Sequence, residues 1–182
     1  MISVIRVAIL VGFPAFFVSP VDARPLPQDD VFRASFELLL KADAVYDRAI
    51  GDKGIRPEEY KAFETLWRAG KEGKDYALKL VRAEAPAARV YGAILLRELA
   101  KEAAEQEFPR MEEEITTVWI HFGCERDPAT IGDIVRLLKM GGFVIMTPTG
   151  KWSSKKIDRT LKEMGVRRKV FNIPLTKRSV KR

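Results

Sequence analysis

The stretch KEGKDYALKLVRAEAPAARVYGAILLRELAKEAAE, residues 71–105, decides the fold. It predicts a short helix over 75–84, a break at Ala85-Pro86 and a longer helix over 86–105, because proline is well tolerated at the first helical position. Two helices that meet at a proline turn form an αα-hairpin. The apolar stripe of the second helix is wide, so we expect neighbouring helices to cover it on more than one side.

Helical patterns also precede this hairpin. The acidic pair at 29–30 is suited to cap a first helix, since a carboxylate accepts the free N–H groups of the first turn. Apolar residues at helical spacing then continue to Ile50, which predicts one long helix or two joined near Asp43. Pro57 starts the next helix. The glycines that bracket residues 70–73 predict a polar turn ahead of the hairpin.

The pattern changes after residue 115. Residues 116–122, TTVWIHF, are β-branched and aromatic, which predicts a strand. Gly123-Cys124 follows the strand, and the Asp127-Pro128 pair predicts a charged turn. The β character of this part contrasts with the helical patterns of the preceding residues.

A further helix is expected after this turn. Thr130 and Asp133 have capping-box spacing, and an apolar stripe follows them until Gly141-Gly142 ends the helix. Later patterns predict a strand over 143–147, a last helix starting at Ser153 or Ser154, and a short strand over 170–175.

Together these patterns predict a mainly α chain in which a HEAT-like αα-hairpin superhelix carries a small C-terminal α/β appendage. Consecutive helical pairs of this length are the building units of such solenoids. The expected organisation is a helical domain over 24–115, a small α/β region over 116–175 packed on it, and a basic tail over 176–182.

The segment PAARVYG, residues 86–92, opens a helix after a proline, and Gly123-Cys124 comes later in the chain. A short helix, a Pro-Ala-x-x-x-Tyr helix and a later Gly-Cys pair, in that order, resemble a group of uncharacterised secreted bacterial proteins with HEAT-like helical hairpins. The resemblance covers residues 57–142 and implies no activity. Ala85 departs from the pattern, because a capping Thr or Ser is expected there, worth about 1 kcal/mol.

The first 23 residues have the pattern of a secretory signal peptide. Arg6 supplies the early charge, residues 7–21 carry none, and small residues surround a cleavage point after Ala23. The uncharged run has 15 residues, whereas a membrane span needs about 20. We therefore expect a secreted or periplasmic protein that contacts the membrane only transiently through its signal peptide. A chain anchored in the membrane by this segment is the alternative.

His121 and Cys124 are the only His and the only Cys of the chain. Their H-x-x-C spacing supplies two metal ligands, but zinc needs three or four, so Glu125 and Asp127 would have to complete the site. Alternatively, His121 would activate Cys124 as a nucleophile. Ordinary packing, a reactive thiol or an intermolecular disulfide are the other interpretations. We expect no catalytic residue, no metal and no cofactor, and we take Cys124 as a candidate reactive thiol.

The formal net charge of +7 is concentrated at the C-terminus. Residues 151–182 hold 12 Lys and Arg against 2 Asp and Glu, a net of +10, whereas residues 1–150 have a net charge of −3. This segment predicts an anionic partner, which outside the cytoplasm is an anionic envelope component rather than nucleic acid. A solvated tail is the alternative. The candidate binding residues are Lys151, Lys155, Lys156, Arg159, Arg167, Arg168 and Lys169.

No constellation of residues demands a reaction. We therefore expect a secreted or periplasmic, non-enzymatic protein-binding or scaffold protein, which uses its helical faces for a protein partner or its basic segment for an anionic surface. The alternatives are an enzyme that uses His121 and Cys124, and a nucleic-acid or anionic-polymer binder that uses the basic C-terminal segment.

Overall fold

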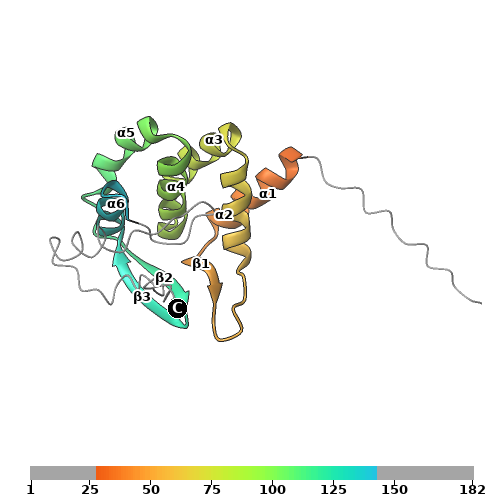
Figure 1. Cartoon of the computed structure of the whole chain (residues 1–182). Coiled ribbons are helices and arrows are strands. Elements are labelled where there is room, and N and C mark those ends of the chain that lie inside the picture. The colour runs from red at the N-terminus through yellow and green to blue at the C-terminus, as the bar shows by residue number, and fades with distance from the viewer. Residues whose placement is uncertain (1–27, 143–182) are drawn as a thin grey trace, which may run out of the picture.

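The structure is a computed structural model that describes residues 28–142 (Figure 1). This part contains six helices and a three-stranded sheet. Their order is α1 (Gln28–Leu40), β1 (Ala44–Ile50), α2 (Glu58–Arg68), α3 (Lys71–Leu80), α4 (Pro86–Leu99), α5 (Lys101–Met111), β2 (Thr117–Gly123), β3 (Glu125–Thr130) and α6 (Ile131–Lys139). The prediction of a mainly helical chain with a small sheet is confirmed.

Several predicted features lie outside the described residues. They are the signal peptide with its cleavage point after Ala23, the strand over 143–147, the following helix and strand, and the basic tail. Within residues 28–142, no helix has both the length and the apolar character needed to cross a membrane.

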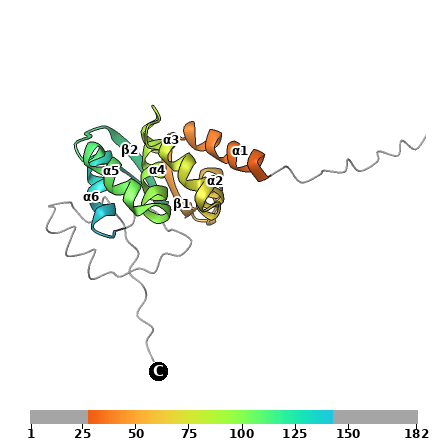
Figure 2. The same ribbon diagram turned by 90° about the horizontal axis from the view of Figure 1, so that it is seen from above.

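Helix α4 is the centre of the fold. It contacts each of the other five described helices and also strands β1 and β2. Figures 1 and 2 show it between α2 and α3 on one side and α5 and α6 on the other. Its residues from Val90 to Leu96 are all buried, which confirms the wide apolar stripe expected for this helix. Each large side chain buried in this way contributes about 1.5–3 kcal/mol.

The predicted hairpin is present as α3 and α4. Helix α4 begins at Pro86, and Ala85 at the N-cap makes no side-chain hydrogen bond, as its methyl group requires. The two helices approach closely at Gly92, where a Cβ atom would lie 2.6 Å from the main-chain nitrogen of Val81. Glycine at this position therefore allows α4 to touch the end of α3.

The polar turn predicted over 70–73 is wrong, because α3 already begins at Lys71 and Gly73 lies inside it. Gly73 is buried against α2, and a Cβ atom there would come within 2.0 Å of the carbonyl oxygen of Leu66. This glycine serves close packing rather than a turn.

The prediction of a helix continuing to Ile50 is also wrong. Helix α1 ends at Leu40, and β1 pairs in parallel with β2, which comes after four intervening helices. The main-chain N–H of Tyr46 donates a hydrogen bond to the hydroxyl oxygen of Tyr91 on α4 at 2.8 Å. The apolar spacing of β1 also fits a helix, and the segment is a strand because it pairs with these distant partners.

The helix predicted over 86–105 is two helices. Helix α4 ends at Leu99, and Ala100, with φ −155° and ψ 72°, separates it from α5. Pro109 lies inside α5, near its C-terminus. A proline in the last turn removes only one main-chain hydrogen bond, so the helix continues past it.

The predicted strand over 116–122 is confirmed as β2, but the charged turn after it is wrong. Residues Glu125–Thr130 form β3, antiparallel to β2, and the reversal occurs at Gly123, with φ +53°, and Cys124. The sheet order is β1-β2-β3, so β3 is an edge strand within the described part and can accommodate Pro128. The sheet therefore combines β1, from the expected helical domain over 24–115, with β2 and β3, from the expected α/β region over 116–175.

Helix α6 begins as its sequence predicts. The side-chain oxygen of Thr130 accepts the main-chain N–H of Asp133 at 3.1 Å, and the threonine hydroxyl contacts the Asp133 carboxylate at 2.8 Å. Thr130 is thus confirmed as the cap of the helix, but the Asp133 carboxylate accepts the Thr130 hydroxyl rather than the main-chain N–H that a full capping box uses. The apolar stripe of the helix is buried at Ile131, Ile134, Val135 and Leu138.

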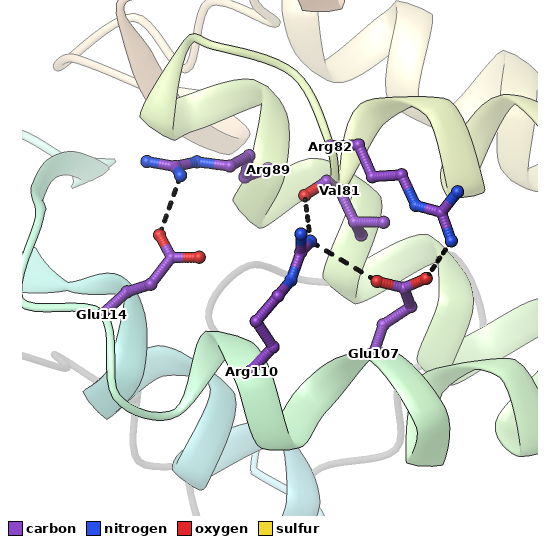
Figure 3. Close-up of polar contacts among 6 residues, drawn as sticks. All are labelled: Val81, Arg82, Arg89, Glu107, Arg110 and Glu114. Atoms are coloured by element: carbon purple, nitrogen blue, oxygen red, sulfur yellow. Dashed lines mark hydrogen bonds and ion pairs between the residues drawn. The ribbon is translucent and has the colours of Figure 1, made fainter.

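Ion pairs connect the helical elements (Figure 3). Glu107 of α5 pairs with Arg82, which follows α3, and with Arg110 of its own helix at 3.4 Å. Arg110 also donates to the carbonyl oxygen of Val81, the residue that ends α3, at 3.5 Å. Both arginine side chains are more than half exposed, at 63% and 60%, so these contacts contribute little to stability.

Candidate functional site

Two aromatic rings, an imidazole and a guanidinium lie on one face of the sheet. Side chains alternate between the two faces of a strand, and in β2 the buried Val118 points toward the core whereas Trp119 is 42% exposed. The strand register sets Tyr46 of β1 and Arg126 of β3 on either side of His121. We call Tyr46, Trp119, His121 and Arg126 the aromatic face.

Trp119 and Arg126 form a cation–π pair. The guanidinium carbon of Arg126 lies 4.7 Å from the centroid of the Trp119 ring, a contact worth about 0.5–1 kcal/mol at an exposed site. Within residues 28–142 the structure shows no ion pair and no side-chain hydrogen bond for Arg126. The indole therefore holds the guanidinium, whose N–H groups have no side-chain partner in this part of the chain.

Tyr46 and His121 form the other half of the aromatic face. Their ring centroids are 4.8 Å apart, with an angle of 32° between the planes. The Tyr46 hydroxyl donates to Oδ1 of Asp43 at 3.1 Å. Burial, together with this hydrogen bond and the carboxylate charge, raises the pKa of Tyr46. Asp43, the residue before β1, therefore helps to hold the ring pair in place.

His121 has a buried nitrogen without a partner. Nε2 of the ring is enclosed and makes no hydrogen bond among the described residues. Burial and the nearby charge of Arg126 lower the pKa of His121, while Asp43 opposes them. Because the ordinary pKa of histidine is already below 7, the imidazole is neutral at physiological pH. A neutral ring lies next to Arg126 in the sheet without charge repulsion.

Cys124 lies at the exposed tip of the β2–β3 hairpin. Its Sγ donates to Oδ1 of Asp52, in the loop after β1, at 2.9 Å. This hydrogen bond raises the pKa of the Cys124 thiol, and partial desolvation and the charges of Asp52 and Glu125 act in the same direction. A raised pKa disfavours the thiolate, which is the nucleophilic and metal-binding form.

The structure gives His121 and Cys124 different partners. The imidazole stacks on Tyr46, whereas the thiol bonds to Asp52, and no hydrogen bond joins the two side chains. No cluster of three or more His, Cys, Asp or Glu side chains suited to a metal ion occurs in the described part of the chain. The H-x-x-C spacing therefore does not produce a hydrogen-bonded pair of His121 and Cys124 in the structure.

Two depressions lie away from the aromatic face. One of about 540 Å³ is an open surface hollow lined by Leu40, Ala83, Glu84 and Ala85. The other, of about 160 Å³, lies between α4, α5 and α6 and is lined by Arg97, Lys101, Ala104, Glu105, Phe108, Leu138 and Lys139. The smaller one is below the usual 300–1,000 Å³ of a ligand pocket. Its lysines already pair with Glu105 and Glu112.

The basic residues predicted to bind an anionic partner lie outside the described residues. They are Lys151, Lys155, Lys156, Arg159, Arg167, Arg168 and Lys169. His121 and Cys124, with the neighbouring Glu125 and Asp127, lie within the described residues.

Comparisons with protein-family models, curated proteins and solved structures find no match for this chain. The resemblance to secreted proteins with HEAT-like hairpins stays a prediction.

Sequence reasoning did not single out three of the four residues of the aromatic face. The alternation in TVWIHF, residues 117–122, was a usable signal, because it places Trp119 and His121 on the same side of a strand. No local signal could add Tyr46 and Arg126. Their positions beside His121 depend on the register of two further strands.

Proposed function

We propose that this chain is a non-enzymatic protein-binding protein whose partner docks on the aromatic face. The observation that supports this is the exposed Trp119, on which the guanidinium of Arg126 lies without an ion pair among residues 28–142. Trp, Tyr and Arg supply most of the binding energy at protein interfaces. The rings are held by contacts within the sheet, so little side-chain entropy is lost when a partner binds.

The proposal places this activity outside the cytoplasm. The signal-peptide pattern of residues 1–23 supports a secreted or periplasmic location, with anchoring by the same segment as the alternative. A HEAT-like arrangement is proposed for the consecutive helices α2 to α5, in which α3 and α4 form the closest pair. In this arrangement the helices act as a scaffold that holds the sheet.

Site-specific photo-crosslinking in cells that express the chain tests the proposal. A photoreactive amino acid at Pro128, which is exposed and pairs with Trp119, reports on the aromatic face. The same probe at Arg33 on α1, with a side chain 73% exposed, is the control. We expect one discrete protein adduct from position 128 and none from position 33. The double substitution Trp119→Ala and Arg126→Ala should abolish the adduct.

An adduct from position 128 that persists in the double variant would contradict the proposal. Equal adducts from positions 128 and 33 would do so as well, since they indicate random encounters. Thermal unfolding of the double variant provides the control for folding, because both side chains are exposed and their loss should leave the midpoint nearly unchanged.

A second proposed function is binding of an anionic envelope component through the basic C-terminal segment. The net charge of +10 over residues 151–182 supports it. Full-length protein and a variant with Gln in place of the seven candidate Lys and Arg residues should be compared for binding to heparin and to vesicles with anionic lipids. The proposal expects the variant to lose most of the binding, and unchanged binding would contradict it.

A further inference from the structure

Strand β3 has one side that no other described strand covers. The sheet order β1-β2-β3 puts it at an edge, where it pairs only with β2. Such an edge presents main-chain N–H and C=O groups to which an extended peptide can add as a further strand. Strand β1, at the other edge, is different, because the N–H of Tyr46 is already bonded to Tyr91.

The position of Pro128 shows which main-chain groups face outward. Proline has no N–H for the ladder, so within a sheet it is accommodated where its nitrogen faces away from the neighbouring strand. Main-chain groups change sides at each residue of an antiparallel strand. The N–H and C=O of Arg126, two residues before Pro128 in β3, therefore face the same outward side. Arg126 presents both its main chain and its side chain to an incoming segment.

Arg126 also selects the charge of that segment. A residue on an added strand directly opposite Arg126 would have its Cβ within about 4.5–5.5 Å, on the same face of the sheet. The guanidinium has no ion pair within residues 28–142, and the Trp119 ring holds it in position. A carboxylate opposite it would complete a two-pronged, charge-assisted hydrogen bond.

The charge of the described part argues against a general attraction for polyanions. Residues 28–142 contain 18 Lys and Arg and 22 Asp and Glu, a net charge of −4. A long anionic polymer would be repelled by this surface, whereas a short peptide with one carboxylate at the right position would not. The missing donor at Pro128 also limits the length over which a new strand can pair.

We infer that the partner of the aromatic face contributes an extended acidic segment, which adds to the outer edge of β3 and places a carboxylate against Arg126. This inference rests on the proposed function and adds to it the chemistry and geometry of the partner. Apolar side chains next to the carboxylate would then contact Trp119 on the same face.

The test uses the full chain and two defined probes. They are the N-acetylated, C-amidated pentapeptide TVEVT and its counterpart TVQVT, which differ only in the central carboxylate. Binding is followed by NMR through the indole N–H of Trp119, assigned with Trp119→Phe, and the Nε–H of Arg126. We expect the glutamate peptide to shift both signals and to bind at least about tenfold more tightly than the glutamine peptide, as a charge-assisted hydrogen bond does.

Variants at Arg126 identify the group responsible. Arg126→Gln should bind both peptides equally weakly, and Arg126→Lys should retain part of the preference, because it keeps the charge but loses the planar donor pair. Arg33→Gln removes one exposed charge from α1 and is the matched control, with the tenfold preference unchanged.

The inference is overturned if the two peptides bind equally or if neither binds. It is also overturned if an oligosaccharide of uronic acids, another source of carboxylates, binds more tightly at Arg126 than the glutamate peptide. These failures differ from failure of the proposed function. A protein adduct at position 128 that depends on Trp119 but not on Arg126 would contradict only the acidic-segment inference. Absence of that adduct would remove the proposed function itself.

Discussion

The hydroxyl oxygen of Tyr91 accepts the main-chain N–H of Tyr46 at 2.8 Å, which joins the central helix α4 to strand β1. Tyr91 is completely buried, and burial raises the pKa of its hydroxyl well above the ordinary value. Tyr46 in turn stacks on His121. One buried hydroxyl thus positions the strand that carries Tyr46, one of the four residues of the aromatic face.

Replacing Tyr91 by Phe should destabilise the fold. The change keeps the ring but removes the acceptor, so the N–H of Tyr46 is left unpaired at a cost of about 1–3 kcal/mol. Urea unfolding measures this difference. Tyr76→Phe is the matched control, because the Tyr76 ring is only partly buried against Phe36, and it should change stability by less than about 0.5 kcal/mol. Equal effects of the two substitutions would contradict the role of the hydrogen bond.

Stability should fall above pH 10 because of two tyrosines. Burial, aided by nearby carboxylates, raises the pKa of Tyr60 to about 12, and burial raises that of Tyr91 still more clearly from the ordinary 10.0. Above pH 10 the unfolded chain releases these protons while the folded chain keeps them, so the unfolding free energy decreases as pH rises. The stabilisation is fully present below pH 10 and is lost as the pH rises toward the pKa values of the two tyrosines in the folded chain.

Urea unfolding at pH 9 and pH 11 measures this loss. Tyr91→Phe and Tyr60→Phe should each show a smaller decrease between these pH values than the unsubstituted chain, since each removes one of the groups that titrates. A decrease of the same size in both variants and in the unsubstituted chain would show that other groups cause it.

The ion pair between Arg89 and Glu114 should contribute more than a surface pair. Nη1 of Arg89 lies 2.9 Å from Oε2 of Glu114, and both side chains are only 20% exposed (Figure 3). The contact is an ion pair without hydrogen-bond geometry, since this oxygen and Nε of Arg89 are both enclosed and unsatisfied. Removing one partner leaves the other charge half-desolvated, so Arg89→Met or Glu114→Gln should cost about 1–3 kcal/mol.

Double-mutant cycles separate the coupling of this pair from the effects of the single changes. Lys101 and Glu105, 3.8 Å apart and 84% and 67% exposed, provide the comparison. Their coupling should be about 0.3 kcal/mol. Coupling between Arg89 and Glu114 that is no larger than this would refute the prediction.

The thiol of Cys124 should become more reactive when Asp52 loses its charge. The hydrogen bond and the carboxylate charge of Asp52 both raise the pKa of the thiol, so Asp52→Asn should lower it and increase the thiolate fraction near neutral pH. The rate of alkylation by iodoacetamide between pH 7 and pH 9 measures this. Asp30→Asn on α1 is the control and should leave the rate unchanged. A slower reaction in Asp52→Asn would contradict the assignment.

The elements that could be predicted from the sequence are those with local signals. Pro86 at the start of α4, the β-branched run of β2 and the Thr130 cap of α6 each depend on a few adjacent residues. Their geometry follows from main-chain sterics and nearby hydrogen bonds. The wide apolar stripe of α4 likewise showed that it is covered on several sides.

Strands β1 and β3 could not be predicted, because each of these segments is a strand only through its pairing with β2. The segment AVYDRAI of β1 has apolar spacing that fits a helix as well as a strand, and its partner follows after four helices. The segment ERDPAT of β3 is polar and contains proline, so only its pairing with β2 makes it a strand. The aromatic face depends on both registers, and sequence reasoning therefore found only His121.

The affinity of the partner crosslinked at position 128 tests the central claim most directly. Calorimetric titration of the purified partner into the unsubstituted chain, Trp119→Ala and Arg33→Ala gives three dissociation constants. If the aromatic face is the binding surface, Trp119→Ala should weaken binding at least about thirtyfold, as expected for a residue that dominates an interface. Arg33→Ala should change it less than about twofold. Binding by Trp119→Ala within about twofold of the unsubstituted chain would contradict the account.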